Sequence, residues 1–150
     1  DRGWLDAVSN AFLIRSPREM LTSLAKVLKA PRLEDTGLPQ QVEIFERVRE
    51  RTGRIPPVVD SKDVLDDPRG TLSALCDALG VPFDEAMLHW PPGPRATDGV
   101  WAKYWYDSVE RSTGFQPYQP KPDEVPESLQ QVLDQAEECY QLLFPHRLRP

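Results

Sequence analysis

A short apolar run that ends in an arginine and passes directly into a helix signal constrains the fold of this chain most. The run comprises residues 11–15, Ala-Phe-Leu-Ile-Arg. Consecutive apolar residues of this kind are typical of a strand buried on both faces, as in a parallel sheet. Ser16 is a favourable N-cap, Pro17 suits the first helical position, and Glu19 would complete a capping box with Ser16. The sequence therefore predicts a strand over 11–15 followed at once by a helix.

The helix that begins at Pro17 is predicted to continue until Pro31, which would end it. Apolar residues recur along it at helical spacing, so that one face can pack on a sheet. These residues are Met20, Leu21, Leu24, Val27 and Leu28.

A second strand-and-helix unit lies further along the chain. Residues 57–60 form a predicted short strand, with prolines only at its entry, where no ladder donor is needed. Asp60 at its end is interpreted as a structural or helix-capping carboxylate. Another helix is predicted from Pro68, capped by one of the two aspartates before it, to Gly80. Cys76 falls on the apolar face of that helix and is interpreted as a small core residue.

The other segments complete an α/β pattern. A helix over 38–52 is closed by Gly53, residues 90–125 are irregular, and a C-terminal helix covers 126–144. Two strands, each followed by a helix, indicate an α/β fold with parallel pairing. Because two strands are too few for a sheet, we expect further strands upstream of residue 1, in a longer parent protein.

Composition excludes several classes of function. Eighteen Lys and Arg against 24 Asp and Glu give a net charge of −6, which disfavours indiscriminate nucleic-acid binding. Two cysteines and two histidines make neither a disulfide framework nor a zinc site, and we expect no metal. No run approaches 18 apolar residues, and no charged-then-apolar leader opens the chain. We therefore expect a protein that does not enter membranes and is cytoplasmic.

Chemistry is most readily placed at the end of the first strand. In open α/β sheets, ligands bind outside the carboxyl ends of the strands. Arg15 stands at that edge, directly ahead of a helix N-terminus, where a phosphate or another anion is favoured. Ser23, eight residues on, could reach the same anion. The alternative is that Arg15 pairs with a surface carboxylate and Ser23 is a solvated helix residue.

Residues 14–23, Ile-Arg-Ser-Pro-Arg-Glu-Met-Leu-Thr-Ser, resemble a motif of the sulfotransferase family. In that family the motif grips the 3′-phosphate of the sulfate donor 3′-phosphoadenylyl sulfate. The resemblance implies that Arg15 and Ser23 contact this phosphate.

Three further stretches resemble the same family in the same order. Residues 58–68 are similar to its strand and "DL..DP" segment, and residues 75–83 to the "LC..LG.PF" segment of bacterial members. Residues 95–103 resemble the late loop that folds over the donor nucleotide, although the first glycine is absent and the spacing is one residue short. The resemblance assigns nucleotide contacts to Arg95, Gly99, Trp101 and Lys103. Trp101 or Trp105 would offer the adenine a flat apolar surface, and core packing is the alternative for both.

The resemblance also implies a P-loop NTPase-like, three-layer fold with a parallel sheet. Residues 1–150 would be the C-terminal portion of a single domain. Within it, residues 10–89 would hold the strand-and-helix units with the 3′-phosphate motif, 90–125 the nucleotide-covering loop and 126–144 the C-terminal helix.

The parent protein is expected to transfer a sulfuryl group from 3′-phosphoadenylyl sulfate to a hydroxyl or amine. The chain contains no Gly-rich phosphate loop and no histidine ahead of Arg15. Its expected partners are therefore the nucleotide, the acceptor and the N-terminal half of its own domain, and alone it is expected to be inactive. The alternatives are a non-catalytic interaction domain and a P-loop kinase relative.

Overall fold

A computed structural model describes residues 3–100, 102, 106–120 and 124–150. In chain order its elements are η1 (Gly3–Ala7), β1 (Phe12–Ile14), α1 (Pro17–Leu24), η2 (Leu33–Thr36), α2 (Leu38–Thr52), β2 (Val58–Asp60), α3 (Ser61–Asp66), α4 (Pro68–Leu79), η3 (Glu85–Leu88), α6 (Asp107–Glu110), η4 (Glu127–Leu129), α7 (Gln130–Leu143) and η5 (Phe144–His146), where η marks a 3₁₀ helix. Among these described elements, no helix is both long and apolar enough to cross a membrane.

The two predicted strands lie side by side and run parallel, which confirms the α/β reading. Phe12 of β1 is paired with Val58 of β2, and Ile14 with Asp60. The C-terminal segment adds a contact that the sequence did not predict. Arg147 forms a parallel bridge to Val58, and the Leu148 amide donates to the Val58 carbonyl at 2.8 Å. β2 therefore lies between β1 and the C-terminal segment, and in the described part of the chain no strand pairs with the outer edge of β1.

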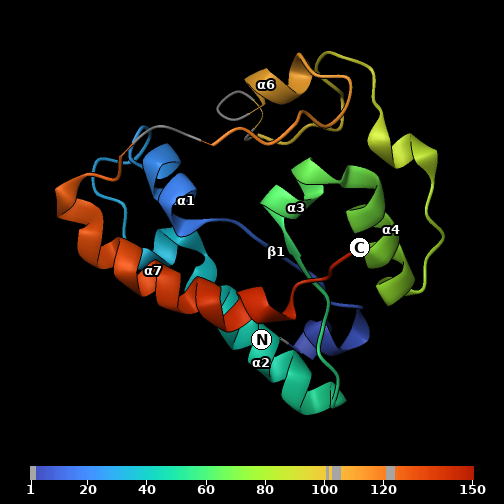
Figure 1. The fold of residues 1–150 in the computed structure, drawn as a ribbon, viewed down its shortest axis with the longest axis horizontal. Coiled ribbons are helices and arrows are strands. Elements are labelled where there is room, and N and C mark those ends of the chain that lie inside the picture. The colour runs from blue at the N-terminus through green and yellow to red at the C-terminus, as the bar shows by residue number, and fades with distance from the viewer. Residues whose placement is uncertain (1–2, 101, 103–105, 121–123) are drawn as a thin grey trace.

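One face of the sheet rests on α2 and α7, which pack against each other below the strands in Figure 1. Fully buried apolar side chains fill this interface because apolar residues from both strands and both helices converge there. The cluster comprises Phe12, Ile14, Phe45, Val58 and Leu143. Phe12 meets Phe45 edge to face at a centroid distance of 5.6 Å, and His146 stacks on the other side of Phe45 at 5.2 Å.

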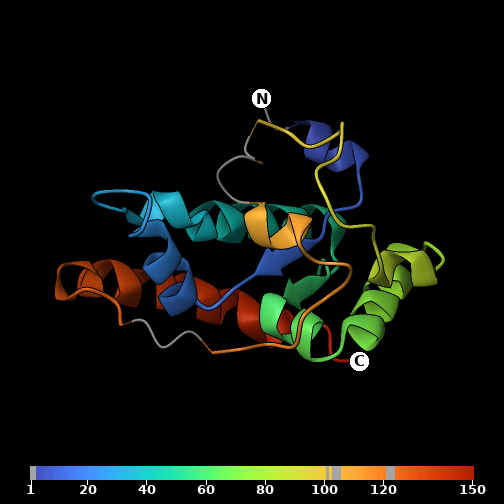
Figure 2. The same cartoon turned by 90° about the horizontal axis from the view of Figure 1, so that it is seen from above.

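The opposite face of the sheet is covered at Val59, which is 4% exposed, and open at Leu13. Leu13, whose side chain alternates with Phe12 and Ile14 along β1, is 61% exposed. The segment that carries α6 lies on this side of the sheet (Figures 1 and 2).

Helix α1 is shorter than predicted, since it ends at Leu24 and the prediction of a helix up to Pro31 is wrong. Helix stability in proteins comes mainly from packing of an apolar face. Val27 and Leu28 find little to pack on and are 56% and 38% exposed. The chain therefore leaves the helix in a turn, with the Leu28 amide donating to the Leu24 carbonyl at 2.7 Å.

The capping signals of the other helices are confirmed. Gly53 and Gly80 close α2 and α4 with φ of 65° and 70°, in the left-handed region that favours glycine. The Asp67 side chain caps α4 by accepting from the Gly70 amide at 2.9 Å. Helix α3, which was not predicted, starts where Asp60 accepts from the Lys62 amide at 2.7 Å.

The long segment that begins at residue 89 folds back so that residues 89–93 contact residues 110–115, although little of it is regular. His89 forms an antiparallel bridge to Gly114, and the Gly93 amide donates to the Glu110 carbonyl. Trp90 packs edge to face on Phe115 at 5.2 Å. These contacts hold residues 115–119 close to the carboxyl end of β1, where Tyr118 reaches α1.

Candidate functional site

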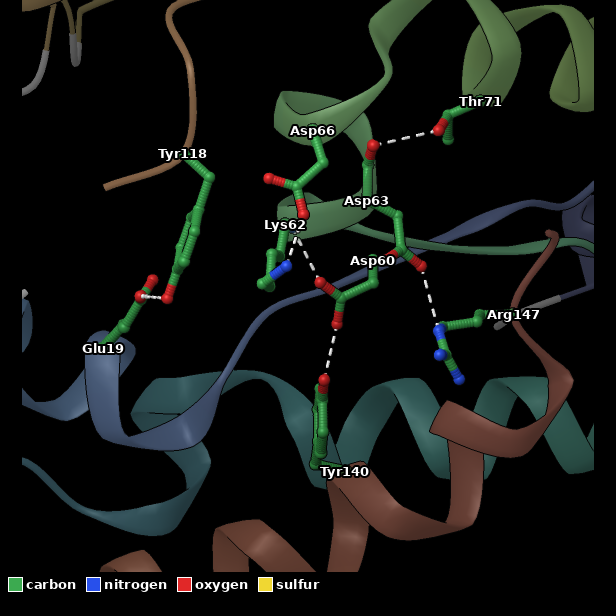
Figure 3. Close-up of polar contacts among 9 residues, drawn as sticks. All are labelled: Glu19, Asp60, Lys62, Asp63, Asp66, Thr71, Tyr118, Tyr140 and Arg147. Carbon is green, nitrogen blue, oxygen red and sulfur yellow. Dashed lines mark hydrogen bonds and ion pairs between the residues drawn. The ribbon is translucent and has the colours of Figure 1, made fainter. Parts of the chain in front are cut away.

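The carboxyl ends of the two strands bring together the residues that carry chemistry. Arg15 and Ser16 follow β1 directly, and Asp60 ends β2. Because the strands are parallel, both chains leave the sheet at the same edge, where α1 and α3 begin. Figure 3 shows the polar side chains that gather there from α1, α3, α7 and the segment around Tyr118.

Arg15 uses one of its three guanidinium nitrogens in a hydrogen bond at this edge. Its Nε donates to Glu19 Oε2 at 3.1 Å, one helical turn further on, and its side chain is 39% exposed. Among the described residues, none accepts from its two terminal nitrogens. The side chain lines a cavity of about 790 Å³ that opens beside the strand end. Arg15 thus lines a cavity and has a carboxylate partner for Nε, while its terminal nitrogens have no acceptor among the described residues.

Ser23 lies on α1 and bonds to the backbone of Glu19, not to its carboxylate. Its Oγ donates to the Glu19 carbonyl at 2.9 Å, a back-bond within α1. Ser23 is absent from the lining of the cavity that Arg15 lines. The structure therefore connects both predicted residues to Glu19 but does not place them on one cavity.

Glu19 is the centre of this arrangement, in a role that the sequence did not predict. The expected capping box is absent, because Ser16 makes no side-chain cap bond. The Glu19 carboxylate, 11% exposed, accepts instead from Arg15 and from the Tyr118 hydroxyl, the latter at 2.6 Å on Oε1. The carboxylate of Glu19 raises the pKa of Tyr118, since ionisation would lose the hydrogen bond and place two negative charges together. In this arrangement the carboxylate pairs with a cation and a hydroxyl instead of the backbone amide that a capping box would offer it.

Asp60 has the structural, helix-capping role that the sequence predicted for it. It is 3% exposed, caps α3 and accepts from the Tyr140 hydroxyl at 2.6 Å (Figure 3). Burial, followed by this bond to a carboxylate, raises the pKa of Tyr140 far above its ordinary value. Next to it, Arg147 Nε donates to Asp63 Oδ2 at 2.9 Å and its guanidinium stacks on Phe144. These pairs fasten α7 and the C-terminal segment to β2 and α3.

The late-loop residues are only partly described. The Arg95 amide donates to Asp98 Oδ2 at 2.7 Å, which closes a tight turn, and the Arg95 side chain is exposed. Among the described residues, no atom lies within 4 Å of a Cβ added at Gly99, and Gly99 does not have a positive φ. Trp101, Lys103 and Trp105 lie outside the described residues.

The cavity itself is mainly apolar. Its wall includes Leu13 and the buried Val59 from the sheet together with residues of α3 and α4, and Phe115 and Tyr118 line it from the long segment. Arg15 and Glu19 stand at its polar end. Among the described residues, no three His, Cys, Asp or Glu side chains come close enough to hold a metal ion.

A parallel α/β sheet with an arginine at its carboxyl edge, ahead of a helix, defines a class: an α/β protein with a candidate anion-binding edge. A family comparison narrows the class. Residues 1–142 match the family model of the sulfotransferase domain, and the chain belongs to that family.

Two curated relatives come from Arabidopsis thaliana. The chain is 39% identical over 134 residues to branched-chain-amino-acid aminotransferase-like protein 1, and 35% identical over 134 residues to protein 2 of the same name. Each match covers 89% of this chain and 24% of the relative. The chain thus spans about a quarter of the length of these relatives. No solved structure matches it.

Proposed function

We propose that this chain supplies the 3′-phosphate half of a donor site for 3′-phosphoadenylyl sulfate, in a protein that transfers the sulfuryl group to a hydroxyl or amine. The observation that carries the proposal is Arg15, which lines a cavity, has no acceptor for its two terminal nitrogens among the described residues, and lies in a stretch that resembles a motif of the sulfotransferase family. A guanidinium presents paired donors that match phosphate oxygens. The N-terminus of α1 adds a positive partial charge at the same edge.

Ser23 is proposed as a second donor to the same phosphate. Its hydroxyl would have to turn away from the Glu19 carbonyl, which costs a local bond within the helix. A bond to a charged phosphate oxygen would offset that loss.

The proposal is tested by calorimetry on the full-length protein with 3′-phosphoadenosine 5′-phosphate. Arg15→Ala should weaken binding by about 1.5–3 kcal/mol, the range for hydrogen bonds to a charged group. Arg18→Ala is the matched control, because Arg18 is an exposed arginine on the same helix. Unchanged affinity in Arg15→Ala would mean that Arg15 only pairs with Glu19.

The loop over residues 95–105 is proposed to close over the nucleotide. Arg95 would add a second cation to the phosphate that Arg15 holds, Trp101 a stacking surface for adenine, and Lys103 a further charge. The open space around Gly99 supports a backbone approach to a ligand. Hydrogen exchange should slow across 95–105 when nucleotide binds and much less near Val132 in α7. Equal exchange with and without nucleotide would reduce the loop to a packing role.

We propose that another segment of the full-length protein binds the phosphosulfate group and contains the reaction centre. This chain would form the C-terminal part of the same P-loop NTPase-like sheet. In the described part of the chain the outer edge of β1 is unpaired and Leu13 is exposed, which supports this, since an unpaired edge and an exposed apolar side chain are suited to adding a strand and a helix. Catalysis would then depend on positioning and on charge stabilisation of the moving group. Nucleotide binding without transfer would instead identify a non-catalytic member, and a preference for ATP a kinase relative.

A further inference from the structure

A contact between two distant parts of the chain ends at the proposed phosphate site. Tyr118 lies 99 positions after Glu19, yet its hydroxyl donates to Glu19 Oε1 at 2.6 Å (Figure 3). The other oxygen of the same carboxylate accepts from Arg15 Nε at 3.1 Å. Three side chains thus form a chain of hydrogen bonds that runs from the long segment, through α1, to the arginine at the strand end.

We propose that Glu19 and Tyr118 are positioning residues for the donor nucleotide: they hold the Arg15 guanidinium so that its two terminal nitrogens face the 3′-phosphate. The inference rests on the proposed function, because it gives Arg15 a phosphate to face. It goes beyond that function in assigning a role to the segment around Tyr118, which lies after the loop proposed to cover the nucleotide.

The geometry of Arg15 supports this role for Glu19. An unrestrained arginine side chain has many rotamers, and fixing one on ligand binding costs conformational entropy. The bond from Nε to Glu19 restrains the guanidinium before the ligand arrives and leaves the terminal pair for a planar, two-pronged contact. The Glu19 carboxylate is itself held on a helix and is 11% exposed, so it is a fixed anchor.

Tyr118 is needed because the charge of Glu19 alone would oppose phosphate binding. A bare carboxylate beside an anion repels it. Arg15 satisfies one oxygen of Glu19, and the Tyr118 hydroxyl satisfies the other, which fixes the carboxylate and lowers its effective charge toward the ligand. The raised pKa of Tyr118 keeps its hydroxyl protonated, and therefore a donor, through the neutral range.

The Tyr118 ring is held in turn by Lys62. The Lys62 ammonium lies 5.1 Å from the ring centroid, within the range of a cation–π contact. Lys62 is also paired with Asp66 on α3. The helix that follows β2 therefore supports the residue that orients the arginine after β1, as Figure 3 shows from Lys62 to Tyr118 and Glu19.

The test is a change in preference between two nucleotides, measured by calorimetry on the full-length protein. Tyr118→Phe removes the donor and keeps the ring. The Kd of 3′-phosphoadenosine 5′-phosphate should rise about three- to tenfold, the scale of one hydrogen bond. The Kd of adenosine 5′-phosphate, which lacks the 3′-phosphate, should stay within about twofold of the original on the same scale. Tyr106→Phe, which removes a hydroxyl from the same long segment, should change neither value.

The possible outcomes separate this inference from the proposed function. If Tyr118→Phe changes both Kd values equally, or neither, Tyr118 only fastens the segment to α1 and the inference is wrong. Glu19→Gln should reduce the preference for the 3′-phosphorylated nucleotide as Tyr118→Phe does, and an unaltered preference would also overturn it. If Arg15→Ala leaves the preference unaltered, the proposed function itself fails.

Discussion

At the scale of single residues, Asp60 shows how both oxygens of a buried carboxylate at the candidate site can be engaged in structural hydrogen bonds. Its two oxygens accept from the Lys62 amide and from the Tyr140 hydroxyl, and it is 3% exposed. Both bonds join elements that must meet for the sheet edge to exist: β2 with α3, and β2 with α7. A carboxylate whose acceptor sites are used in this way is a poor candidate for proton transfer.

The Tyr140 bond predicts a stability that depends on pH. Tyr140 stays protonated in the folded protein, because its pKa is raised by burial and by Asp60, whereas in the unfolded chain it ionises near pH 10. The free energy of unfolding should therefore fall above about pH 10, where only the unfolded chain loses this proton. Tyr140→Phe should cost about 1–3 kcal/mol at pH 7, because Asp60 loses a donor. Urea unfolding should show this difference shrinking above about pH 10; a difference that is constant with pH would contradict the assignment.

At the scale of elements, the C-terminal segment behaves as a third, very short strand beside β2. The Leu148 amide bonds to the Val58 carbonyl, and Arg147 is anchored to Asp63 with side chains 16% and 30% exposed. The guanidinium of Arg147 lies 3.6 Å from the Phe144 ring centroid. Such a short pairing depends on its side-chain anchors, since few ladder bonds hold it.

Arg147→Ala should therefore lower the free energy of unfolding by about 1.5–3 kcal/mol, the scale of a hydrogen bond to a charged group. Arg149→Ala, two residues along and exposed, should stay within about 0.5 kcal/mol of the original. Chemical denaturation of the three proteins gives the comparison. Equal, small effects of both substitutions would mean that the segment is not anchored through Arg147.

Local signals predicted most of the elements and few of their contacts. The apolar spacing of α2 and α4 and the glycines that close them act within a few residues, and they were interpreted correctly. The end of α1 was not, because it depends on what Val27 finds to pack on. The Tyr118–Glu19 and Tyr140–Asp60 contacts join residues 99 and 80 positions apart, and no spacing rule reaches across such separations. Arg15 was proposed as a site residue from a local motif, and Glu19 was assigned a cap because the capping-box pattern is local too.

At the scale of the whole molecule, one face of the sheet is packed and the other is open at Leu13. Leu13 is 61% exposed in the middle of β1, between Phe12 and Ile14, which are 7% and 0% exposed. We expect another segment of the full-length protein to cover this face. In that protein Leu13→Asp should cost about 2–3 kcal/mol, the value of burying a leucine side chain.

Val27→Asp is the matched control, because Val27 is 56% exposed and lies beyond the end of α1. It should cost no more than about 0.5 kcal/mol. Thermal unfolding of both variants measures the difference, and two equally mild variants would show that the face at Leu13 is open in the full-length protein.

A crystal structure of the full-length protein with 3′-phosphoadenosine 5′-phosphate tests most directly whether Arg15 binds the 3′-phosphate. We expect 3′-phosphate oxygens within about 2.7–3.2 Å of the terminal nitrogens of Arg15. Arg15 Nε should still donate to Glu19, and Tyr118 should still donate to the other oxygen of Glu19. A nucleotide whose 3′-phosphate lies away from Arg15, with the guanidinium bound to Glu19 alone, would contradict this assignment.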